Sequence, residues 1–386
     1  MSLFTHLECP QCNQYFPADE IQTFCQECQA PILARYDLTT AREKLDRDEF
    51  RHRQSGMWRW HELLPVSDLR YISNLGEGDT PLLPILGRGG NKGISNIWVK
   101  DESRNPTASF KARGLSAAVS KAKEIGLDQL VIPTAGNAGG ALAAYASRAR
   151  IKSAAVMPKD TPSAIVNECR YYGAEVILVD GLISDCAEVV KEMTSSGDWF
   201  SISTFQEPYR LEGKKIMAYE LAEAFNWSLP DVIIYPTGGG TGLVGMWKAF
   251  LEMISMGWLQ DSHLPRMISV QSEGCAPVVK AFQSGAERCE FWDNAETIAS
   301  GLRVPLSLAD RMILDILRQS GGSAIAVSDA SMLDAQATLA SREGIFASPE
   351  GAATLSALNK LIASGFIQPD ESVVLFITAS GLKYVS

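Results

Sequence analysis

The hydrophobic positions of this chain follow two alternating patterns. Short runs rich in β-branched residues are bounded by turn-forming residues, and between them apolar residues recur with helical spacing. The runs predict strands at 97–99, 129–133, 152–157, 175–179, 231–235, 267–271 and 372–378. Such alternation is typical of parallel sheets with helices on both faces. The pattern therefore predicts an α/β fold built on open, largely parallel sheets.

Several of the predicted strands end in loops of small residues that open a helical segment. The clearest examples are VIPTAGNAGG, VIIYPTGGGTG and VVLFITASG, which contain Asn137, Gly238–Gly242 and Thr378. In open α/β sheets, ligands bind beyond the carboxyl ends of the strands. We therefore expect these loops to converge on one ligand.

Length, charge and hydropathy narrow the class of protein. With 386 residues the chain is long enough for two domains. Its formal net charge of −10 opposes binding to polyanions, which argues against nucleic acid as the main partner. No apolar run reaches the roughly 20 residues that cross a bilayer, and the start MSLFTHLECP does not follow the pattern of a signal peptide. We expect a cytoplasmic protein whose partner is neither a membrane nor a nucleic acid.

Four of the eight cysteines lie near the start of the chain. They form two C-x-x-C pairs, Cys9 with Cys12 and Cys25 with Cys28, which is the spacing of a zinc ribbon. A segment this short cannot bury a core, so zinc would supply its folding free energy, and four thiolates leave no open position on the metal. We predict a structural zinc-ribbon-like segment at 1–36. Metal-free or redox-active thiols are the alternative.

Two segments carry the strongest signs of chemistry. The sequence NPTASFK places Lys111 at the start of a predicted helix, where the positive end of the helix dipole favours the neutral, nucleophilic form of an amine. Gly238–Gly242 follows a predicted buried strand and opens a helix, as in loops that hold a phosphate with backbone N–H groups.

Each of these signals has an ordinary structural explanation when it is taken alone. A lysine such as Lys111 in a first helical turn is most often a solvated charge, and Gly238–Gly242 also suits a tight turn without a ligand. A helix cap is the alternative for Asn137, and a plain C-terminal turn is the alternative for Thr378.

Taken together, these segments resemble the fold-type II enzymes that depend on pyridoxal 5′-phosphate (PLP), and most closely the threonine synthase family. The order and spacing of the four segments carry the resemblance, together with the EGDTPL sequence at 77–82. The resemblance covers essentially the whole chain, including the cysteine pairs. It implies a fold like that of the tryptophan synthase β subunit, with two open, largely parallel α/β subdomains and an N-terminal zinc-ribbon-like segment.

The resemblance also implies roles for single residues. Lys111 would be the catalytic residue and would bind PLP as a Schiff base, Asn137 would contact O3′ of the cofactor, and Thr378 would face its pyridine nitrogen. The PLP phosphate would be held by the loop residues Gly238, Gly239, Gly240, Thr241 and Gly242. A neutral hydroxyl at Thr378 cannot hold the ring nitrogen protonated as an aspartate would, which suits elimination and replacement better than transamination.

The chain departs from the family pattern near the substrate. Ala112 stands where the family has aspartate, Ala138 stands where a hydroxyl residue is common, and Phe205 replaces a polar residue ahead of the PYRLEG sequence. Arg210 is retained in that sequence, and the resemblance implies that it binds the phosphate of the substrate. An exposed structural salt bridge is the alternative for Arg210.

The expected reaction is γ-elimination of phosphate from O-phospho-L-homoserine, followed by addition of water at Cβ to give L-threonine. Lys111 would move the protons, and Arg210 with Lys214 or Lys215 would bind the departing phosphate. The alternative is a threonine or serine ammonia-lyase (dehydratase) on the same fold, which needs no second phosphate site. A non-catalytic protein that kept the fold is a third reading, and an intact Lys111 gives it little support.

The predicted organisation places the catalytic region after the zinc-ribbon-like segment, at 37–386. Its large subdomain is expected at about 37–130 plus 211–386, and its small subdomain at about 131–210. Family resemblance implies a homodimer that acts on a small amino-acid substrate.

Overall fold

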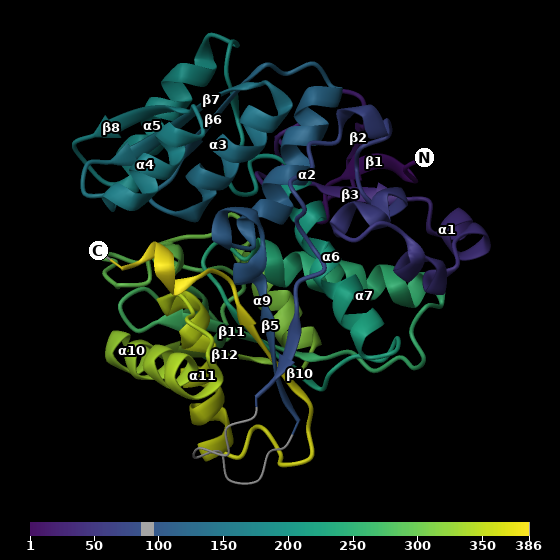
Figure 1. Ribbon diagram of the computed structural model, residues 1–386, viewed down its shortest axis with the longest axis vertical. Coiled ribbons are helices and arrows are strands. Elements are labelled where there is room, and N and C mark those ends of the chain that lie inside the picture. The colour runs from purple at the N-terminus through teal and green to yellow at the C-terminus, as the bar shows by residue number, and fades with distance from the viewer. Residues whose placement is uncertain (86–95, 386) are drawn as a thin grey trace. The chain divides into compact units, whose positions relative to one another are not determined.

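The computed structural model describes residues 1–85 and 96–385 (Figure 1). The chain forms two compact units. The first contains residues 1–79 and 105–216, and the second contains residues 80–104 and 217–385. The boundary between the two units at residue 216 falls inside helix α6 (Tyr209–Ala224). The predicted subdomains divide the chain at other points, and their boundaries stay a prediction.

The first unit begins with a small antiparallel sheet, purple in Figure 1, whose strands lie in the order β2-β1-β3. Its strands are β1 (Phe4–Glu8), β2 (Tyr15–Pro17) and β3 (Leu33–Tyr36). Helix α1 (Leu38–Lys44) follows the sheet and begins where the carboxylate of Asp37 accepts the backbone N–H of Thr40. Three short 3₁₀ helices follow α1, at Arg47–His52, Met57–Leu63 and Leu69–Tyr71.

The first unit also contains a parallel sheet with the strand order β8-β7-β6-β9. Strands β6 (Gln129–Pro133), β7 (Lys152–Pro158) and β8 (Glu175–Val179) lie within one residue of their predicted positions. The edge strand β9 (Phe200–Ser201) is too short to show a hydrophobic period, so the sequence pattern missed it. The helices that accompany this sheet are α2 (Lys111–Glu124), α3 (Asn137–Ala149), α4 (Ser163–Tyr171) and α5 (Ile183–Ser195).

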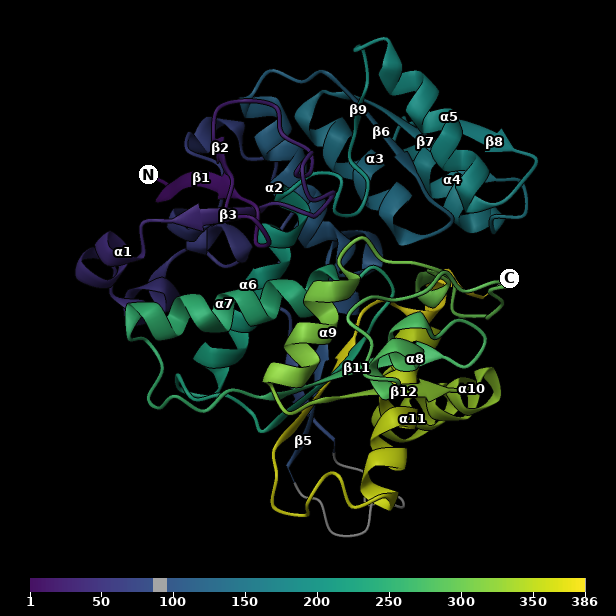
Figure 2. The same cartoon turned by 180° about the vertical axis from the view of Figure 1, so that it is seen from behind.

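Alternate side chains of this sheet enter different cores. Leu130 and Ile132 of β6 pack in one core with residues of α2 and α3, whereas Val131 between them packs with Cys186 and Val190 of α5. Figure 2 shows the helices α3, α4 and α5 beside the strands that they cover. Because both faces are covered, the strands appear in the sequence as continuous apolar runs, which is typical of buried parallel sheets.

The second unit contains a larger sheet with the strand order β12-β11-β10-β13-β5-β4. Its strands are β4 (Leu82–Pro84), β5 (Ile97–Asp101), β10 (Val232–Pro236), β11 (Arg266–Ser272), β12 (Ser323–Val327) and β13 (Val373–Ile377). All neighbouring strands pair in parallel apart from β4, which pairs antiparallel with β5 at the edge. The small residues of β12, with the sequence SAIAV, hid this strand from the sequence pattern.

The core of the second unit lies between its sheet and helix α11. Val232 and Ile234 of β10 and Leu375 of β13 pack with Ala352 and Leu358 of α11. Both ribbon views show α10 and α11 side by side. The helices of this unit are α7 (Thr241–Met256), α8 (Pro277–Gln283), α9 (Asp310–Gln319), α10 (Asp329–Thr338) and α11 (Pro349–Ala363).

The predicted fold class is confirmed, because each unit is built on an open sheet of mostly parallel strands with helices packed against it. Across residues 1–85 and 96–385, no helix combines the length and apolar character needed to span a membrane.

Candidate active site

Lys111 is the first residue of α2, as predicted, and its side chain is partly buried. The turn before it is strained, because Thr107 and Ala108 have φ angles of 57° and 50°. This left-handed conformation is uncommon for residues other than glycine and least favourable for a β-branched residue such as threonine. Strain of this kind is often found at functional sites. The Lys111 Nζ lies 4.1 Å from the centroid of the Phe110 ring.

The EGDTPL sequence supplies a buried acceptor that holds α2 in place. The fully buried carboxylate of Glu77 accepts hydrogen bonds from Trp58 Nε1 (2.9 Å) and from the hydroxyl of Tyr145 (2.6 Å). It also accepts one from the hydroxyl of Ser116, which lies on α2. Burial and the adjacent carboxylate raise the pKa of Tyr145, so the phenol remains a donor. Glu77 thus links α2, which begins with Lys111, to Trp58 and to Tyr145 of α3 through hydrogen bonds.

Helices α2 and α6 cross at two glycines. A β-carbon on Gly213 would lie 2.0 Å from the carbonyl oxygen of Arg113, and one on Gly114 would lie 2.7 Å from the carbonyl oxygen of Arg210. Any larger side chain at either position would therefore push the helices apart. The crossing places the start of α6 alongside the first turn of α2, which carries Lys111. An isolated glycine inside a helical pattern often has such a packing reason, and this is the signal that could have revealed the crossing.

Arg210, in the first turn of α6, is buried with part of its guanidinium unsatisfied. Its side chain is 1% exposed, and Nη1 donates to the carbonyl oxygen of Ile202 at 2.9 Å. Nε and Nη2 are also buried and have no hydrogen-bond partner among the described residues. The alternative of an exposed salt bridge is therefore wrong for Arg210. Unused donors on a buried cation indicate a place for an anionic ligand.

Lys214 lies one helical turn after Arg210 and shares its face of α6. It is fully buried, and its Nζ lies 4.8 Å from the centroid of the Phe110 ring, which Lys111 also approaches. Burial lowers the pKa of Lys214 well below its ordinary value, and the charges of Arg210 and Lys111 lower it further. We call Lys111, Arg210 and Lys214 the cationic cluster.

Lys215 does not belong to the cationic cluster. Its Nζ lies 2.9 Å from the carboxylate of Glu212 and 3.7 Å from the centroid of the Tyr36 ring. Of the two lysines that the sequence left open, Lys214 is the one on the side of Arg210, and its role in phosphate binding stays a prediction.

Glu207 is a residue near the cationic cluster that the sequence reasoning missed. Its carboxylate accepts the backbone N–H of Tyr209 (2.7 Å) and of Arg210, at the start of α6. Burial raises its pKa to about 7, although Arg210 acts in the opposite direction. An acidic residue just before a helix start is a common cap, and this is the signal that could have pointed to it.

Asn137 is the first residue of α3, and Gly136 occupies the cap position, so the helix-cap explanation for Asn137 is wrong. The neighbouring glycines are packed rather than open. A β-carbon on Gly139 would lie 2.8 Å from the Cε of Met157, and one on Gly140 would lie 2.2 Å from the carboxylate of Glu168. Glycine at these two positions lets the side chains of neighbouring elements approach the backbone of α3 closely.

The glycine-rich loop Gly238–Gly242 joins β10 to α7 in the second unit. Gly240 has φ 84° and no side chain to cap α7, which leaves the first N–H groups of this helix to other acceptors. A β-carbon on Gly238 would lie 2.2 Å from the carbonyl oxygen of Gly301. The start of α7 thus has no side-chain cap, and a phosphate site there stays a prediction.

Thr378 follows β13 in the second unit and is 4% exposed. Its strand end packs against α11, because a β-carbon on Gly351 would lie 3.4 Å from the backbone nitrogen of Thr378. Beside Gly351, the carboxylate of Glu350 accepts the N–H of Gly301 (2.8 Å) and the hydroxyl of Tyr384 (2.9 Å). Through Gly301, Glu350 supports the turn that touches the glycine-rich loop.

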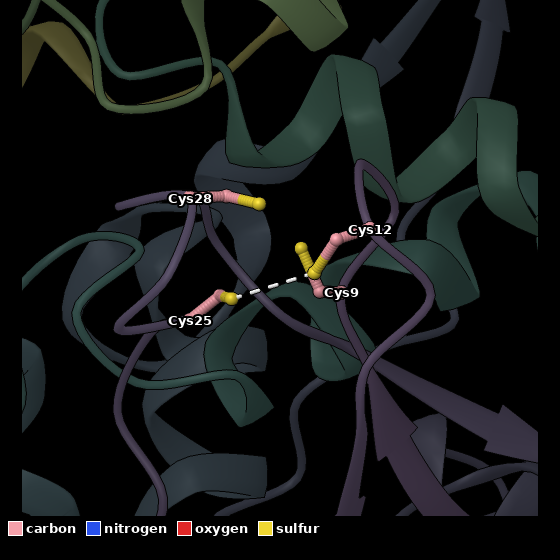
Figure 3. A group of neighbouring side chains, drawn as sticks. All are labelled: Cys9, Cys12, Cys25 and Cys28. Carbon is pink, nitrogen blue, oxygen red and sulfur yellow. Dashed lines mark hydrogen bonds between the residues drawn. The ribbon is translucent and has the colours of Figure 1, made fainter.

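The four N-terminal cysteines lie together, as Figure 3 shows. Their sulfur atoms all lie within 4.8 Å of one another, and the Sγ atoms of Cys12 and Cys25 are 3.7 Å apart. Zinc–sulfur bonds of about 2.3 Å in a tetrahedron require sulfur atoms about 3.8 Å apart. The arrangement of Cys9, Cys12, Cys25 and Cys28 therefore fits the predicted ligand set.

Two equivalent turns hold these cysteines. The N–H of Asn13 donates to the carbonyl oxygen of Cys9, and the N–H of Gln29 donates to the carbonyl oxygen of Cys25. Asn13 and Gln29 both take a left-handed conformation, with φ of 59° and 54°. The sequence did not reveal that the two C-x-x-C pairs share one turn geometry.

The predicted site residues thus fall into distinct groups. The cationic cluster and Asn137 belong to the first unit, and Gly238–Gly242 and Thr378 belong to the second. The convergence of all these residues on one ligand stays a prediction.

Comparison with known proteins shows the family. Residues 73–379 match the model of a family described as pyridoxal-phosphate dependent enzyme. Threonine synthase from Methanocaldococcus jannaschii is 35% identical over 97% of this chain and 92% of its own length. Threonine synthase from Methanosarcina acetivorans is 34% identical over 98% of this chain and 92% of its own length.

Solved structures show the same fold at lower identity. Maize serine racemase has a TM-score of 0.66 and 21% identity, and the match covers 79% of this chain and 89% of that one. The processed form of threonine deaminase isoform 2 from Solanum lycopersicum has a TM-score of 0.66 and 19% identity, covering 78% of this chain and 79% of that one. The fold-type II prediction and the prediction of a PLP-dependent lyase are both confirmed by these matches and the family assignment. The chain therefore belongs to the pyridoxal-phosphate dependent enzymes and, among them, to the threonine synthase family.

Proposed function

We propose that this enzyme converts O-phospho-L-homoserine and water to L-threonine and phosphate. The observation that carries the proposal is the buried edge of Arg210, where Nε and Nη2 have no hydrogen-bond partner among the residues described. Lys214 lies beside it on the same helix face. A departing phosphate needs donors of this kind, whereas a threonine or serine ammonia-lyase releases no phosphate.

The residues of each unit fit PLP as the cofactor. The uncapped start of α7 behind Gly238–Gly242 suits its phosphate, and the amine of Lys111 suits covalent attachment. We assign Asn137, whose Oδ1 is buried, to the cofactor's O3′ and Thr378 to its pyridine nitrogen.

The proposed chemistry divides between the cofactor and this chain. When bound, PLP supplies the electron sink that stabilises negative charge at Cα of the substrate. The ε-amine of Lys111 is the group that takes the proton from Cα and returns protons later. The hydroxyl of Thr378 is neutral, which suits elimination and replacement.

Arg210 and Lys214 stabilise the departing phosphate. Burial and neighbouring cations lower the pKa of Lys214, but an incoming phosphate favours the charged ammonium. The charge of Lys214 is thereby restored when an anion is present. Arg210 and Glu207 favour each other's charged forms, although burial acts against the charge of both.

A threonine or serine ammonia-lyase is the second candidate, and Phe205 favours it. This residue is buried and has φ 62°, and it presents no polar group where the family pattern supplies one ahead of Arg210. A purely binding role for the fold would leave Lys111, with the buried Arg210 and Lys214 near it, without a purpose.

We also propose that Cys9, Cys12, Cys25 and Cys28 bind one structural zinc ion. Their spacing fits a tetrahedral site, and Cys9 and Cys25 are themselves part of the hydrophobic core of the first unit. The homodimer and the cytoplasmic location belong to this proposal too, on the basis of family resemblance and composition.

The first prediction separates the two candidate reactions. With O-phospho-L-homoserine, the holoenzyme should release phosphate and threonine in equal amounts. With threonine or serine alone it should form little 2-oxo acid.

Arg210→Gln should lower kcat/KM for the phosphorylated substrate by roughly 100-fold, because a buried phosphate loses its charged partner. Cofactor absorption in the variant shows that it folds. Formation of 2-oxobutyrate from threonine, without phosphate release from the other substrate, would falsify the synthase assignment.

The second prediction concerns Lys111. Lys111→Ala should lose the visible absorption band of lysine-bound cofactor and essentially all activity, because the variant lacks the amine that forms the Schiff base and moves the protons. Lys123→Ala, at the far end of the same helix, is the matched control and should keep both. A wild-type protein that stays colourless with added PLP would contradict the assignment.

The third prediction concerns the cysteines. Purified protein should contain zinc in a stoichiometric amount, and Cys25→Ser should lower both the zinc content and the thermal unfolding midpoint. Cys289→Ser, outside the group, is the control and should leave the zinc content unchanged. Metal analysis that finds no zinc, with all four thiols free to react, would refute the site.

The fourth prediction concerns the pH dependence of stability. Burial raises the pKa of Glu207 from 4.5 to about 7, so the folded state holds this proton more tightly than the unfolded state. Its contribution to stability is therefore present at low pH and is lost as pH rises through about 7, by up to about 3 kcal/mol. Glu207→Gln should remove this loss. Thermal unfolding of both holoenzymes from pH 5 to 8 measures the difference, and parallel curves would contradict it.

A further inference from the structure

The face of α6 opposite Arg210 and Lys214 carries a second buried set of charges. The hydroxyl of Tyr36 donates to the carboxylate of Glu212 at 2.9 Å, and Lys215 Nζ lies 2.9 Å from the same carboxylate. Both charged side chains are 0% exposed, and Lys215 Nζ also lies 3.7 Å from the centroid of the Tyr36 ring. We call Tyr36, Glu212 and Lys215 the clamp.

A buried ion pair is costly unless its remaining hydrogen-bonding groups are satisfied. Within the clamp, the tyrosine hydroxyl donates to the carboxylate, and the tyrosine ring faces the ammonium. Tyr36 thus contacts both members of the pair. Loss of its hydroxyl would leave Glu212 with fewer donors in a dry environment, and the helix would adjust to restore them.

Tyr36 comes from the N-terminal sheet rather than from the body of the unit. It ends β3, where its backbone lies opposite Phe4 of β1. The Phe4 ring meets the ring of Tyr209, the first residue of α6, edge-on at 6.2 Å. The N-terminal sheet therefore contacts α6 at two places, one beside Arg210 and one a turn later.

The clamp and the pair Arg210 and Lys214 lie on different sides of α6. At about 100° per residue, Glu212 and Lys215 point away from the side that carries Arg210 and Lys214. The crossing with α2 at Gly213 lies between these two sides. A rotation that relaxed the clamp would swing Arg210 and Lys214 by comparable amounts on the opposite side.

We propose that Tyr36 is a positioning residue that acts through Glu212 and α6 on Arg210 and Lys214. We call these two cationic residues, which would bind the phosphate, the anion site. This inference rests on the proposed function, because it assumes that Arg210 binds the phosphate of the substrate. It gives the N-terminal segment a part in substrate binding, in addition to its own folding. Tyr36 itself touches neither substrate nor cofactor in this scheme.

The test compares Tyr36→Phe with Tyr15→Phe in the holoenzyme. Tyr15 lies in the same N-terminal sheet but is 62% exposed and stacks on His6, so it serves as the matched control. For each protein we would measure kcat, KM for O-phospho-L-homoserine and the inhibition constant for inorganic phosphate. Cofactor absorption, zinc content and the thermal midpoint complete the comparison.

Tyr36→Phe should raise both KM and the phosphate inhibition constant by a similar factor, on the order of 5-fold or more. Cofactor absorption and zinc content should not change, and Tyr15→Phe should match the wild type. A lower thermal midpoint with unchanged KM and inhibition constant would overturn the inference, since the clamp would then serve stability alone.

Two further variants keep the test decisive. Arg210→Gln tests the proposed function itself: if it leaves phosphate inhibition unchanged, the anion site is wrong and the inference falls with it. If Arg210→Gln weakens inhibition and Tyr36→Phe does not, only the inference fails. Glu212→Gln keeps an acceptor for Tyr36 but removes the charge beside Lys215, and it should act in the same direction. Failure of both clamp variants to fold would also overturn a positioning role.

Discussion

The close crossing of α2 and α6 is the constraint on which the first unit's chemistry depends. Gly114 and Gly213 let each helix backbone approach the other, where any β-carbon would meet a carbonyl oxygen. The crossing brings Lys111, at the start of one helix, near Arg210 and Lys214 of the other, since both lysines approach the ring of Phe110. The NPTASFK and PYRLEG segments therefore lie next to each other in the structure, although about 100 residues separate them in the sequence.

Two buried carboxylates lie close to the cations of α6. Glu207 lies before its first turn, with a carboxylate that accepts two backbone N–H groups. Glu212 pairs with Lys215 on the far side under Tyr36. Charged contacts on one side of α6 and close glycine contacts on another both restrain the helix that carries Arg210. Local strain at Thr107 and Ala108 is tolerated in such a setting, because the surrounding contacts over-determine the backbone.

The sequence predicted the elements that have a clear period and the sites that have a motif. The strands with dense β-branched residues, such as 129–133, were found where they were expected, whereas β12, rich in alanine, was not. Lys111 at a helix start and the cysteine group were likewise predicted correctly. Three-dimensional contact decided the rest. Lys214 shares the helix face of Arg210, four residues earlier, and approaches Phe110, whereas Lys215 lies over the ring of Tyr36. The close packing of Gly139 and Gly140 also depends on three-dimensional contact, because their neighbours Met157 and Glu168 belong to other elements.

The energetics of Arg210 bear most directly on the choice between synthase and lyase. Each buried donor left without a partner costs about 1–3 kcal/mol, and more on a charged group. Nε and Nη2 of Arg210 are two such donors. A lyase acting on threonine or serine would bear this cost without return, because its substrate brings no second anion. A phosphorylated substrate recovers it on binding, and recovers most as charge accumulates on the leaving oxygen. The buried Nε and Nη2 donors of Arg210 are thus better explained as a binding site for a phosphate than as a feature without function.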